Sequence, residues 1–287
     1  MYPELFKIGP FTVYSFGLML GIAFIVASYL LTKEIERRKL HPNIATEVTL
    51  LAIVFGIVGS KALDLIENWD MFIKDPIGSA FSPGGLTFYG GVILVIIVLL
   101  IYTRRKKIPF LFLADAVAPS LAIGYGIGRI GCHLAGDGDY GIPTNLPWGV
   151  DYSHGTVPPH IMFRGTEIAK SFPNGIVPDN TPLHPTPIYE FIMMMIIFWV
   201  LWRLRKKDWP YGQLFTIYLI LQGMERFLIE FIRLNPRIMF GLSEAQLISI
   251  VMILVGSIGL YYFKTHPDIN RFTPPPFKLE PEKKKKK

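Results

Sequence analysis

The sequence GYGIGRIGCHL, residues 124–134, is apolar and rich in glycine, and Arg129 is its only formally charged residue. A second apolar segment, GQLFTIYLILQGMERFLIEFI at residues 212–232, contains Arg226. An arginine in or near hydrocarbon costs at least a few kcal/mol unless it is paired or solvated. Such arginines are rare in membrane segments and usually mark a substrate site, so Arg129 and Arg226 are the first candidate functional residues.

The composition indicates a membrane protein. Hydrophobic residues make up 51% of the chain and charged residues 18%, and the mean hydropathy is +0.39, whereas a soluble protein has about 25% charged residues. A bilayer core of about 30 Å needs roughly 20 apolar residues per helix. We therefore predict an all-α polytopic membrane protein with seven transmembrane helices at residues 11–32, 44–62, 86–103, 109–134, 188–202, 212–232 and 245–263.

The distribution of lysine and arginine predicts the orientation, because short loops rich in these residues stay in the cytoplasm. Every second connection is basic: Lys33, Arg37, Arg38, Lys39, residues 104–107, residues 203–207, Lys264 and residues 283–287. The intervening connections carry acidic residues: Asp64, Glu67, Asp70, Asp75, Asp137, Asp139, Asp151 and Asp179. We therefore expect the N-terminus outside and the C-terminus in the cytoplasm.

One membrane domain, residues 1–270, accounts for nearly the whole chain and includes an extracytoplasmic loop at residues 136–187. A structureless loop of that length is usually functional or disordered. The tail at residues 271–287 is proline-rich, then basic, and is predicted to be disordered. The first span carries no cleavage site of small residues and is predicted to be an uncleaved helix. The net charge of +7 follows from the topology, and nucleic-acid binding is excluded because the membrane spans interrupt the basic residues.

The densest chemistry lies in residues 128–141, GRIGCHLAGDGDYG. Gly128 and Gly131 allow another helix or a lipid headgroup to approach the backbone closely. The planar guanidinium fork of Arg129 suits a phosphate group. The alternative is an arginine that reaches the outer headgroups, with glycines that serve helix packing alone.

A second constellation consists of Glu225, Arg226, Glu230 and Arg233. Arg226 and Glu230 are four residues apart, so they share a helix face and are predicted to pair, which lowers the cost of placing either in the membrane. A purely structural ion pair is the alternative, and it would explain these residues without any ligand.

Two further motifs lie at predicted outer ends of spans: Tyr89, Gly90 and Gly91, and the sequence HPTPIYE at residues 184–190. Tyr89 alone is typical of an interfacial aromatic residue, and His184 could anchor a helix. No histidine has a second histidine or cysteine at ligand spacing on one helix face, which argues against a zinc hydrolase. The lone Cys132 excludes an internal disulfide and is interpreted as a small buried apolar residue.

The order of these blocks resembles that of the bacterial prolipoprotein diacylglyceryl transferases. The matching blocks are GLMLG at 17–21, LTFYGG at 86–91, residues 128–141, HPTPIYE at 184–190, RFLIEFIR at 226–233 and LSEAQ at 242–246. The resemblance implies an enzyme of the bacterial inner membrane with an active site at its outer face. It implies transfer of the diacylglyceryl group of phosphatidylglycerol to the lipobox cysteine of a prolipoprotein, with release of glycerol phosphate.

The resemblance also implies site residues. Arg129 matches the phosphatidylglycerol-binding arginine, Arg226 and Glu230 match a second essential arginine and its acidic partner, and Asp137 takes the place of the signature glutamate. Other residues implied in substrate binding are Gly128, Gly131, Gly141, Gly90, Gly91, His184 and Tyr14. The partners are phosphatidylglycerol, prolipoprotein signal peptides and membrane lipids, and no metal or dissolved cofactor is implied.

The chain departs from the family pattern around the base that would activate the substrate thiol. Tyr89 replaces a histidine proposed as the base in many members, and Cys132, His133 and Ala135 replace Asn, Phe and Asn. His133 titrates near neutrality and lies about one helical turn from Arg129, so it is a candidate base. Tyr89 is the second candidate if an arginine lowers its pKa, and a reaction without a dedicated base is the third possibility.

Two other functional classes remain open from the residues alone. A transporter of a phosphate-bearing or other anionic lipid-derived substrate could also place Arg129 and Arg226 at an anion site, although the sequence shows no pair of repeated broken helices. A seven-helix photoreceptor is disfavoured because residues 245–263 contain no lysine for a retinal Schiff base.

Overall fold

Each of the seven apolar stretches contains a helix in the computed structural model, which describes residues 1–82, 85, 87–269 and 271–273. These helices are α1 (Ser15–Arg37), α2 (Asn43–Glu67), α5 (Phe88–Lys106), α6 (Phe110–Ala135), α9 (Thr186–Leu204), α10 (Gln213–Ile229) and α11 (Glu244–Thr265). In the described part of the chain, six of them are long and apolar enough to cross a membrane. The remaining helix, α10, has 17 residues and continues into the 3-10 turn η2 (Glu230–Ile232).

The prediction that the first helix begins at residue 11 is wrong. Strand β2 (Phe11–Tyr14) pairs with β1 (Glu4–Ile8) in an antiparallel hairpin, and the backbone N–H of Ser15 donates to the carbonyl of Pro3 at 2.9 Å. Gly9, at φ +57°, supplies the tight turn. Apolar residues in this hairpin extend the hydropathic signal beyond the helix, which explains the error.

The chain forms two compact units. Unit 1 contains Met1–Ala27 and Val117–Asn270, and unit 2 contains Ser28–Ala116 and Arg271–Lys287. Helices α1 and α6 each contribute residues to both units. Most of the tail predicted to be disordered, residues 274–287, lies outside the described residues.

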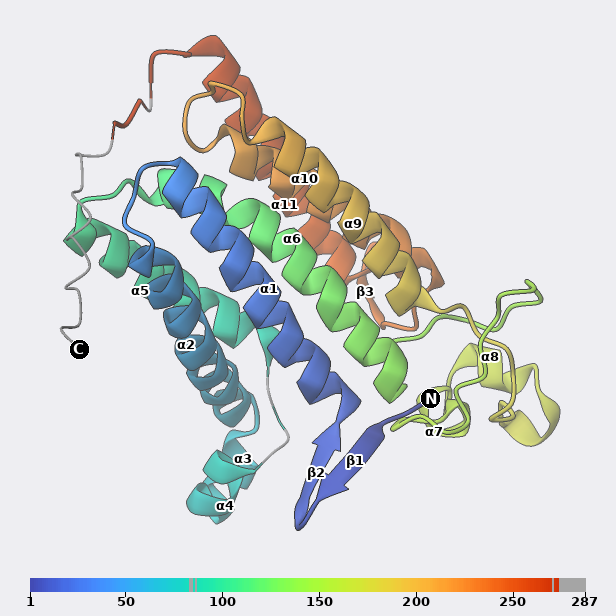
Figure 1. Ribbon diagram of the computed structural model, residues 1–287. Helices are drawn as coiled ribbons and strands as arrows, with labels where there is room; N and C mark the ends of the chain where they lie inside the picture. Colours follow the sequence, from blue (N-terminus) through green and yellow to red (C-terminus); the bar gives the residue numbers. More distant parts are fainter. Residues whose placement is uncertain (83–84, 86, 270, 274–287) are drawn as a thin grey trace. The chain divides into compact units, whose positions relative to one another are not determined.

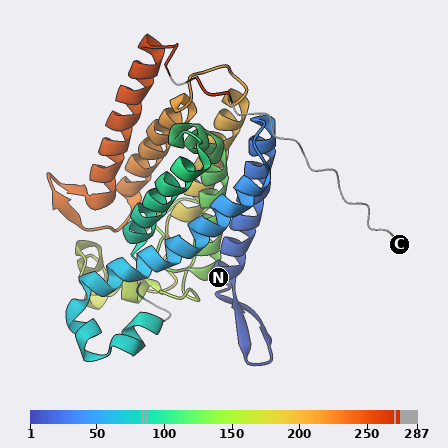
Figure 2. The same ribbon diagram turned by 90° about the vertical axis from the view of Figure 1, so that its left-hand side faces the viewer.

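In unit 2, α2 and α5 pack against each other through glycines (Figure 2). A Cβ atom added to Gly59 would lie 2.4 Å from the carbonyl oxygen of Gly90, and one added to Gly91 would lie 2.5 Å from the hydroxyl of Ser60. The two backbones therefore touch at positions where no larger side chain fits. Two short helices, α3 (Trp69–Lys74) and α4 (Pro76–Phe81), follow α2.

In unit 1, α10 packs against both α9 and α11 (Figure 1). Gly223 on α10 and Gly256 on α11 allow the close contact, since a Cβ at either would meet a backbone oxygen at 2.9 Å or less. A short hairpin of β3 (Arg237–Met239) and β4 (Leu242–Ser243) precedes α11. The side chain of Ser243 then begins α11 with a capping box shared with Gln246.

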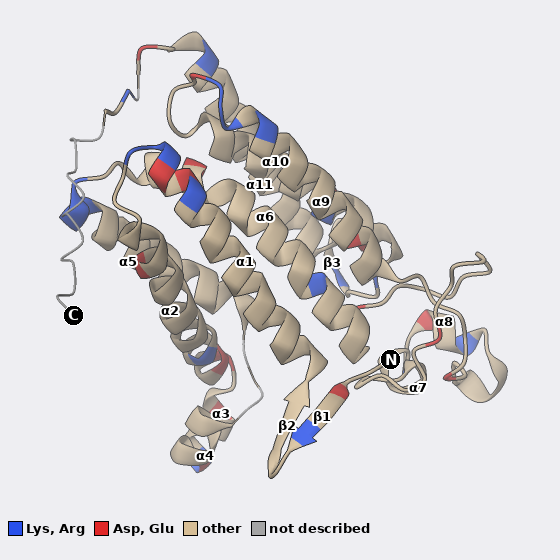
Figure 3. Cartoon of the chain, viewed as in Figure 1, with Lys and Arg blue, Asp and Glu red and all other residues tan. Residues whose placement is uncertain are grey.

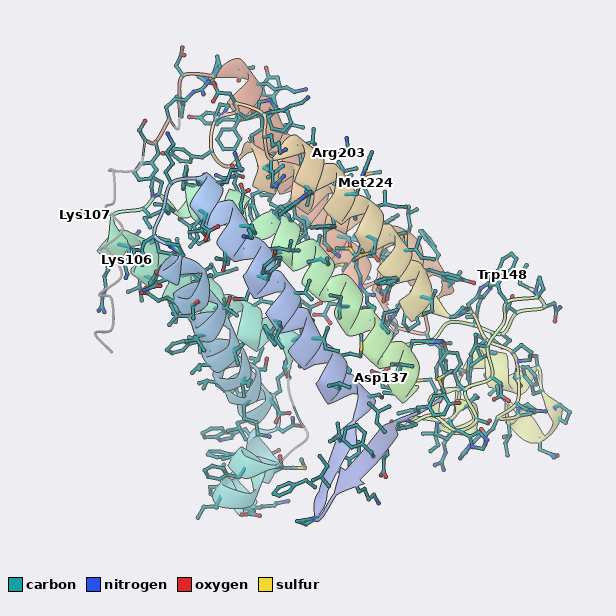
Figure 4. All side chains as sticks on the ribbon, viewed as in Figure 1. Lys106, Lys107, Asp137, Trp148, Arg203 and Met224 are labelled. Carbon is teal, nitrogen blue, oxygen red and sulfur yellow. The ribbon has the colours of Figure 1, made fainter. Side chains whose placement is uncertain are left out.

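The loop at residues 136–187 is ordered, contrary to a structureless loop. It contains α7 (Pro159–Met162), α8 (Glu167–Lys170) and the 3-10 turn η1 (Pro173–Gly175). Tyr140, Tyr152, Phe163 and Leu183 are each 1% exposed or less and form a hydrophobic core of its own. The abundance of Pro, Gly and Asp is compatible with this order, because turn residues can connect buried aromatic anchors as well as flexible segments. Figure 4 shows this loop around Trp148.

Charged side chains gather toward the helix ends, while the middle of α5 and of α11 is uncharged (Figure 3). In unit 1, Arg129, Glu190 and Arg226 lie within two turns of an end of α6, α9 and α10, respectively. The loop and these three helices supply the candidate site.

Candidate functional site

Three arginines and three carboxylates of unit 1 form one connected group, which we call the arginine–carboxylate cluster. Its members are Arg129, Asp139, Glu190, Arg226, Glu230 and Arg233. They come from α6, the loop after α6, α9, α10, η2 and the residue after η2. Three positive and three negative charges balance, which lowers the cost of holding them away from water.

Glu190 lies at the centre of the cluster and is fully buried. One of its oxygens lies 2.6 Å from Nε of Arg129, and the other lies 2.9 Å from Nη1 of Arg226 and 3.6 Å from Nη1 of Arg233. Glu190 therefore contacts all three guanidinium groups. Pro185 and Pro187 lead into α9 and fix the start of the helix, which places Glu190 in its second turn.

The predicted pairing of Arg226 with Glu230 is confirmed, with Nη2 and Oε2 3.1 Å apart. Glu230 is also fully buried, and its other oxygen accepts a hydrogen bond from the side-chain amide of Asn235 at 2.6 Å. The pair is not isolated, because Arg226 also binds Glu190. A simple helix pair thus becomes part of a network that joins α9 to α10.

Asp139 connects the loop to the cluster. One carboxylate oxygen pairs with Arg129 and the other pairs with Arg233. Burial would raise the pKa of Asp139, but these two arginines hold it at about 2, so the group is ionised near neutral pH. The sequence left Asp137 and Asp139 as alternatives, and the structure brings Asp139 to the arginines.

Asp137 lies just beyond the end of α6 (Figure 4). Its oxygen Oδ1 accepts a hydrogen bond from the backbone N–H of Asp139 at 3.3 Å. Burial, followed by the charge of Asp139, raises the pKa of the Asp137 carboxyl. Asp137 therefore shapes the turn that presents Asp139, and a direct role in substrate binding stays a prediction.

Tyr125 supports Arg129 from one turn earlier on α6. The ring lies 4.7 Å from the guanidinium carbon, and the hydroxyl accepts a hydrogen bond from Nη2 at 2.7 Å. The same hydroxyl donates to Glu190 over 3.5 Å. Arg129 is thus held by a cation–π contact, a hydroxyl and two carboxylates, which fixes the plane of its donors.

Several predicted residues lie around this cluster. A Cβ at Gly141 would lie 2.5 Å from the carbonyl oxygen of Ile232 and 3.0 Å from Cβ of His184, so only glycine fits where the loop meets the start of α9. The His184 ring contacts the Tyr189 hydroxyl at 3.3 Å, and burial lowers the pKa of His184. Gly141 and His184 therefore shape the wall beside Asp139.

The candidate base His133 turns toward the loop. Its Nδ1 lies 2.9 Å from the hydroxyl of Tyr152, and the two rings meet edge to face. The one-turn spacing from Arg129 therefore does not place the His133 ring among the contacts of the cluster in the described residues. The thiol of Cys132 is buried, as expected, and lies 3.8 Å from Nη1 of Arg129.

The remaining predicted glycines differ in their surroundings. A Cβ at Gly128 would meet nothing within 4 Å, whereas one at Gly131 would lie 3.1 Å from Cβ of Met19 on α1. Gly131 thus serves helix packing, and Gly128 borders open space. Tyr14 lies in β2 and is 55% exposed.

Tyr89, Gly90 and Gly91 belong to α5 in unit 2. The two glycines pack against α2, which gives them a structural explanation. The Tyr89 ring meets that of Phe88 edge to face. Their roles in the reaction stay predictions.

The site predicted from sequence omitted Glu190, Arg233 and Tyr125. Glu190 was quoted within HPTPIYE without a role, although a carboxylate just inside an apolar helix requires a cationic partner. Arg233 was noted in the second constellation, but its partner Asp139 lies 94 residues earlier. Tyr125 had no signal beyond its one-turn spacing from Arg129.

Comparison with known proteins gives a consistent result. The family model for prolipoprotein diacylglyceryl transferase matches residues 3–262. Proteins named phosphatidylglycerol–prolipoprotein diacylglyceryl transferase are similar to the chain: that of Clostridium tetani is 33% identical over 89% of this chain and 95% of its own length. A second, from Clostridium perfringens, is 34% identical over 87% and 90%, and that of Leptospira interrogans is 30% identical over 89% and 90%.

Proposed function

The chain belongs to the prolipoprotein diacylglyceryl transferase family, and we propose that it transfers the diacylglyceryl group of phosphatidylglycerol to a prolipoprotein cysteine. The observation that carries this proposal is the family match over residues 3–262, which includes every member of the arginine–carboxylate cluster. The same match favours a transferase over the alternative of a transporter of anionic lipid-derived substrates.

The reaction replaces a carbon–oxygen bond by a carbon–sulfur bond. The cysteine sulfur, as thiolate, attacks the glyceryl carbon that bears the phosphate ester oxygen. A thioether forms, and the bonding electrons leave with that oxygen as glycerol phosphate. The thiol proton passes to a base or to water, so atoms and charges balance.

Arg129 and Arg226 act on the leaving phosphate. Negative charge grows on the phosphate oxygens as the carbon–oxygen bond breaks, and guanidinium groups held in place stabilise that charge without reorganisation. Glu190 and Glu230 keep the guanidinium groups converged, because each carboxylate is fully buried and binds more than one arginine. Gly128 leaves open space on the same helix as Arg129, where a lipid headgroup can approach.

The base remains assigned by hypothesis to His133 or Tyr89. His133 is a titratable group at the outer end of α6, and Tyr89 takes the position of the histidine in the family pattern. Replacing His133 by Gln and Tyr89 by Phe in separate variants tests both. Full transfer by both variants would show that neither His133 nor Tyr89 is a required base.

The proposed topology follows from the distribution of lysine and arginine among the loops. We assign α10 with η2 as the seventh span beside the six longer helices, with the N-terminus outside. Residues 1–270 then form the membrane domain, the loop at 136–187 lies outside, and residues 271–287 form a cytoplasmic tail. This places the protein in the inner membrane with the site at its outer face, where it meets prolipoprotein signal peptides.

The direct test uses purified protein, phosphatidylglycerol labelled in its acyl chains and a signal peptide that carries a lipobox cysteine. We expect label on the peptide, and none when cysteine is replaced by serine or when phosphatidylethanolamine supplies the label. Arg129→Gln should abolish transfer while the protein still unfolds cooperatively. Uptake of labelled lipid into vesicles without peptide modification would contradict the proposal and support transport.

A further inference from the structure

Asp139 bridges Arg129 and Arg233 through its two carboxylate oxygens. Each carboxylate oxygen binds a different guanidinium group, Oδ2 that of Arg129 and Oδ1 that of Arg233. A phosphodiester has two unesterified oxygens that share one negative charge, as a carboxylate does. A pair of guanidinium groups, each bound to one of the two oxygens, can therefore bind a carboxylate or a phosphodiester.

We infer that the Asp139 carboxylate occupies the position of the lipid phosphate, and that phosphatidylglycerol binds by displacing it from Arg129 and Arg233. This inference rests on the proposed function. It adds Arg233 to the groups that contact substrate, and it gives Asp139 the role of an exchangeable internal anion.

The charge balance among the six ion-paired members of the cluster favours such an exchange. Three arginines are neutralised by three carboxylates within the cluster. A phosphate that entered beside all three carboxylates would add an uncompensated negative charge to a site with little water, where charge interactions are strong. If one carboxylate leaves as the phosphate enters, the balance is restored.

Asp139 is the carboxylate able to leave. Its side chain is 29% exposed, whereas the side chains of Glu190 and Glu230 are 0% exposed. Glu190 lies on α9 and Glu230 on η2, whereas Asp139 lies in the loop after α6. A rotation of its side chain toward water would free both arginines.

The backbone of Asp139 stays in place during this exchange. Its carbonyl oxygen accepts a hydrogen bond from the hydroxyl of Thr186 at 2.5 Å, and the next residue but one, Gly141, is confined by the start of α9. The exchange therefore needs a change of side-chain rotamer and no movement of the loop.

Arg233 is suited to be a further phosphate ligand, in addition to Arg129 and Arg226. Its side chain is 8% exposed, and Asp139 is its shortest contact, with Glu190 at 3.6 Å and Glu230 at 3.9 Å. Arg226 instead has close contacts with both fully buried glutamates, at 2.9 and 3.1 Å. Loss of Asp139 would leave Arg233 the more available of the two.

The first test measures binding of phosphatidylglycerol to the full-length protein in dodecyl maltoside, which contains no phosphate. Asp139→Asn keeps the shape of the side chain but removes its charge, so we expect binding about tenfold tighter, on the scale of one hydrogen bond between charged groups. Asp151→Asn is the matched control. It removes the same charge from the same loop, where the carboxylate accepts from the backbone N–H of Ser153 at 2.7 Å, and it should leave the affinity unchanged.

A second variant tests the role of Arg233 in phosphate binding. Arg233→Gln should weaken binding about tenfold, and in that background Asp139→Asn should tighten it less than in the wild type, because Asp139 then competes for Arg129 alone. Thermal unfolding keeps the test valid if Asp139→Asn destabilises the protein. Its unfolding temperature without lipid should fall, and phosphatidylglycerol should then raise it by more than in the wild type, because at a given concentration a ligand that binds more tightly stabilises the folded state more.

Three ligands separate the possible sources of the anion. Phosphatidylglycerol should show the full effect of Asp139→Asn, soluble glycerol phosphate should show it at lower affinity, and diacylglycerol should show none. An unchanged or weaker affinity of Asp139→Asn for phosphatidylglycerol overturns the inference, as does tightening by Asp137→Asn alone. Transfer by the wild type is assayed separately: if it occurs while Asp139→Asn fails to bind tighter, the inference fails and the proposed function stands.

Discussion

Two buried carboxylates in this protein are neutralised by arginines in different ways. In unit 2, Glu34 is 1% exposed and pairs with Arg37, the last residue of α1, and with Arg38, the residue after it. In unit 1, Glu190 pairs with arginines from α6, α10 and the segment after η2. The first arrangement is local and stabilises one helix end, whereas the second exists only when several elements are packed. Guanidinium groups that converge from separate elements can bind a substrate anion as well as carboxylates, and for this reason we propose the substrate site in unit 1.

The largest effect is expected from Glu190→Gln. It leaves three arginines with two carboxylates, and removing one partner from a buried ion pair costs about 3–5 kcal/mol. We expect transfer to fall more than about a hundredfold, since the arginines would repel one another out of position. Glu34→Gln is the matched control: it should lower the unfolding temperature, yet each folded molecule should retain full transfer. Equal loss of transfer in both variants would erase the distinction between the two carboxylates.

The next largest effect on transfer is expected from replacing the planar guanidinium group of Arg129. Arg129→Lys keeps the charge but loses the planar donors, so the rate of transfer at saturating phosphatidylglycerol should fall about a hundredfold to a thousandfold. Arg37→Lys, at the local pair of unit 2, should change that rate by less than about twofold. The measurement is the initial rate of peptide labelling. Near-normal turnover of Arg129→Lys would show that charge alone suffices.

A smaller effect is expected from Tyr125→Phe. The ring remains over Arg129, but the hydrogen bond to Nη2 is lost, so we expect transfer about tenfold slower with little change in unfolding temperature. Tyr102→Phe removes a comparable hydroxyl, which donates to Glu47 at 2.7 Å in unit 2, and should not slow transfer. A slow Tyr102→Phe variant would indicate a general effect of lost hydroxyls.

The smallest effect distinguishes two glycines. Gly128→Ala adds a methyl group where nothing lies within 4 Å, so stability should change by less than about 0.5 kcal/mol. If a headgroup occupies that space, the KM for phosphatidylglycerol should rise several-fold, up to about tenfold. Gly59→Ala, where the methyl would meet a carbonyl oxygen at 2.4 Å, should instead lower stability. An unchanged KM for Gly128→Ala would place the headgroup elsewhere.

Much of the fold could be predicted from hydropathy, since every apolar stretch contains a helix. Its boundaries could not, because charged residues such as Arg37 and Lys106 continue helices beyond their apolar segments. Strand β2 was included in the first predicted span because Phe11, Val13 and Tyr14 are apolar, like the helix that follows. The choice between a functional and a disordered loop could not be made from the sequence, because the loop's core depends on contacts between Tyr140, Tyr152 and Leu183, which are separated along the chain.

The candidate site shows the same division. Arg226 and Glu230 could be paired from their spacing because a helix brings residues four apart onto one face. The choice between Asp137 and Asp139 could not be made in this way. It depends on which carboxylate the turn after α6 directs toward Arg233. Asp139 and Arg233 come together only through the packing of α6, α9 and α10.

The sequence by itself determined that this is a membrane protein, that it resembles the diacylglyceryl transferases and that Arg129 and Arg226 require anionic partners. These conclusions rest on composition, local periodicity and the cost of charge in hydrocarbon, all of which are properties of neighbouring residues. Only the tertiary structure decided that Glu190 joins three arginines and that Asp139 bridges two of them. Ion pairs between elements depend on distances in space, which sequence separation does not specify.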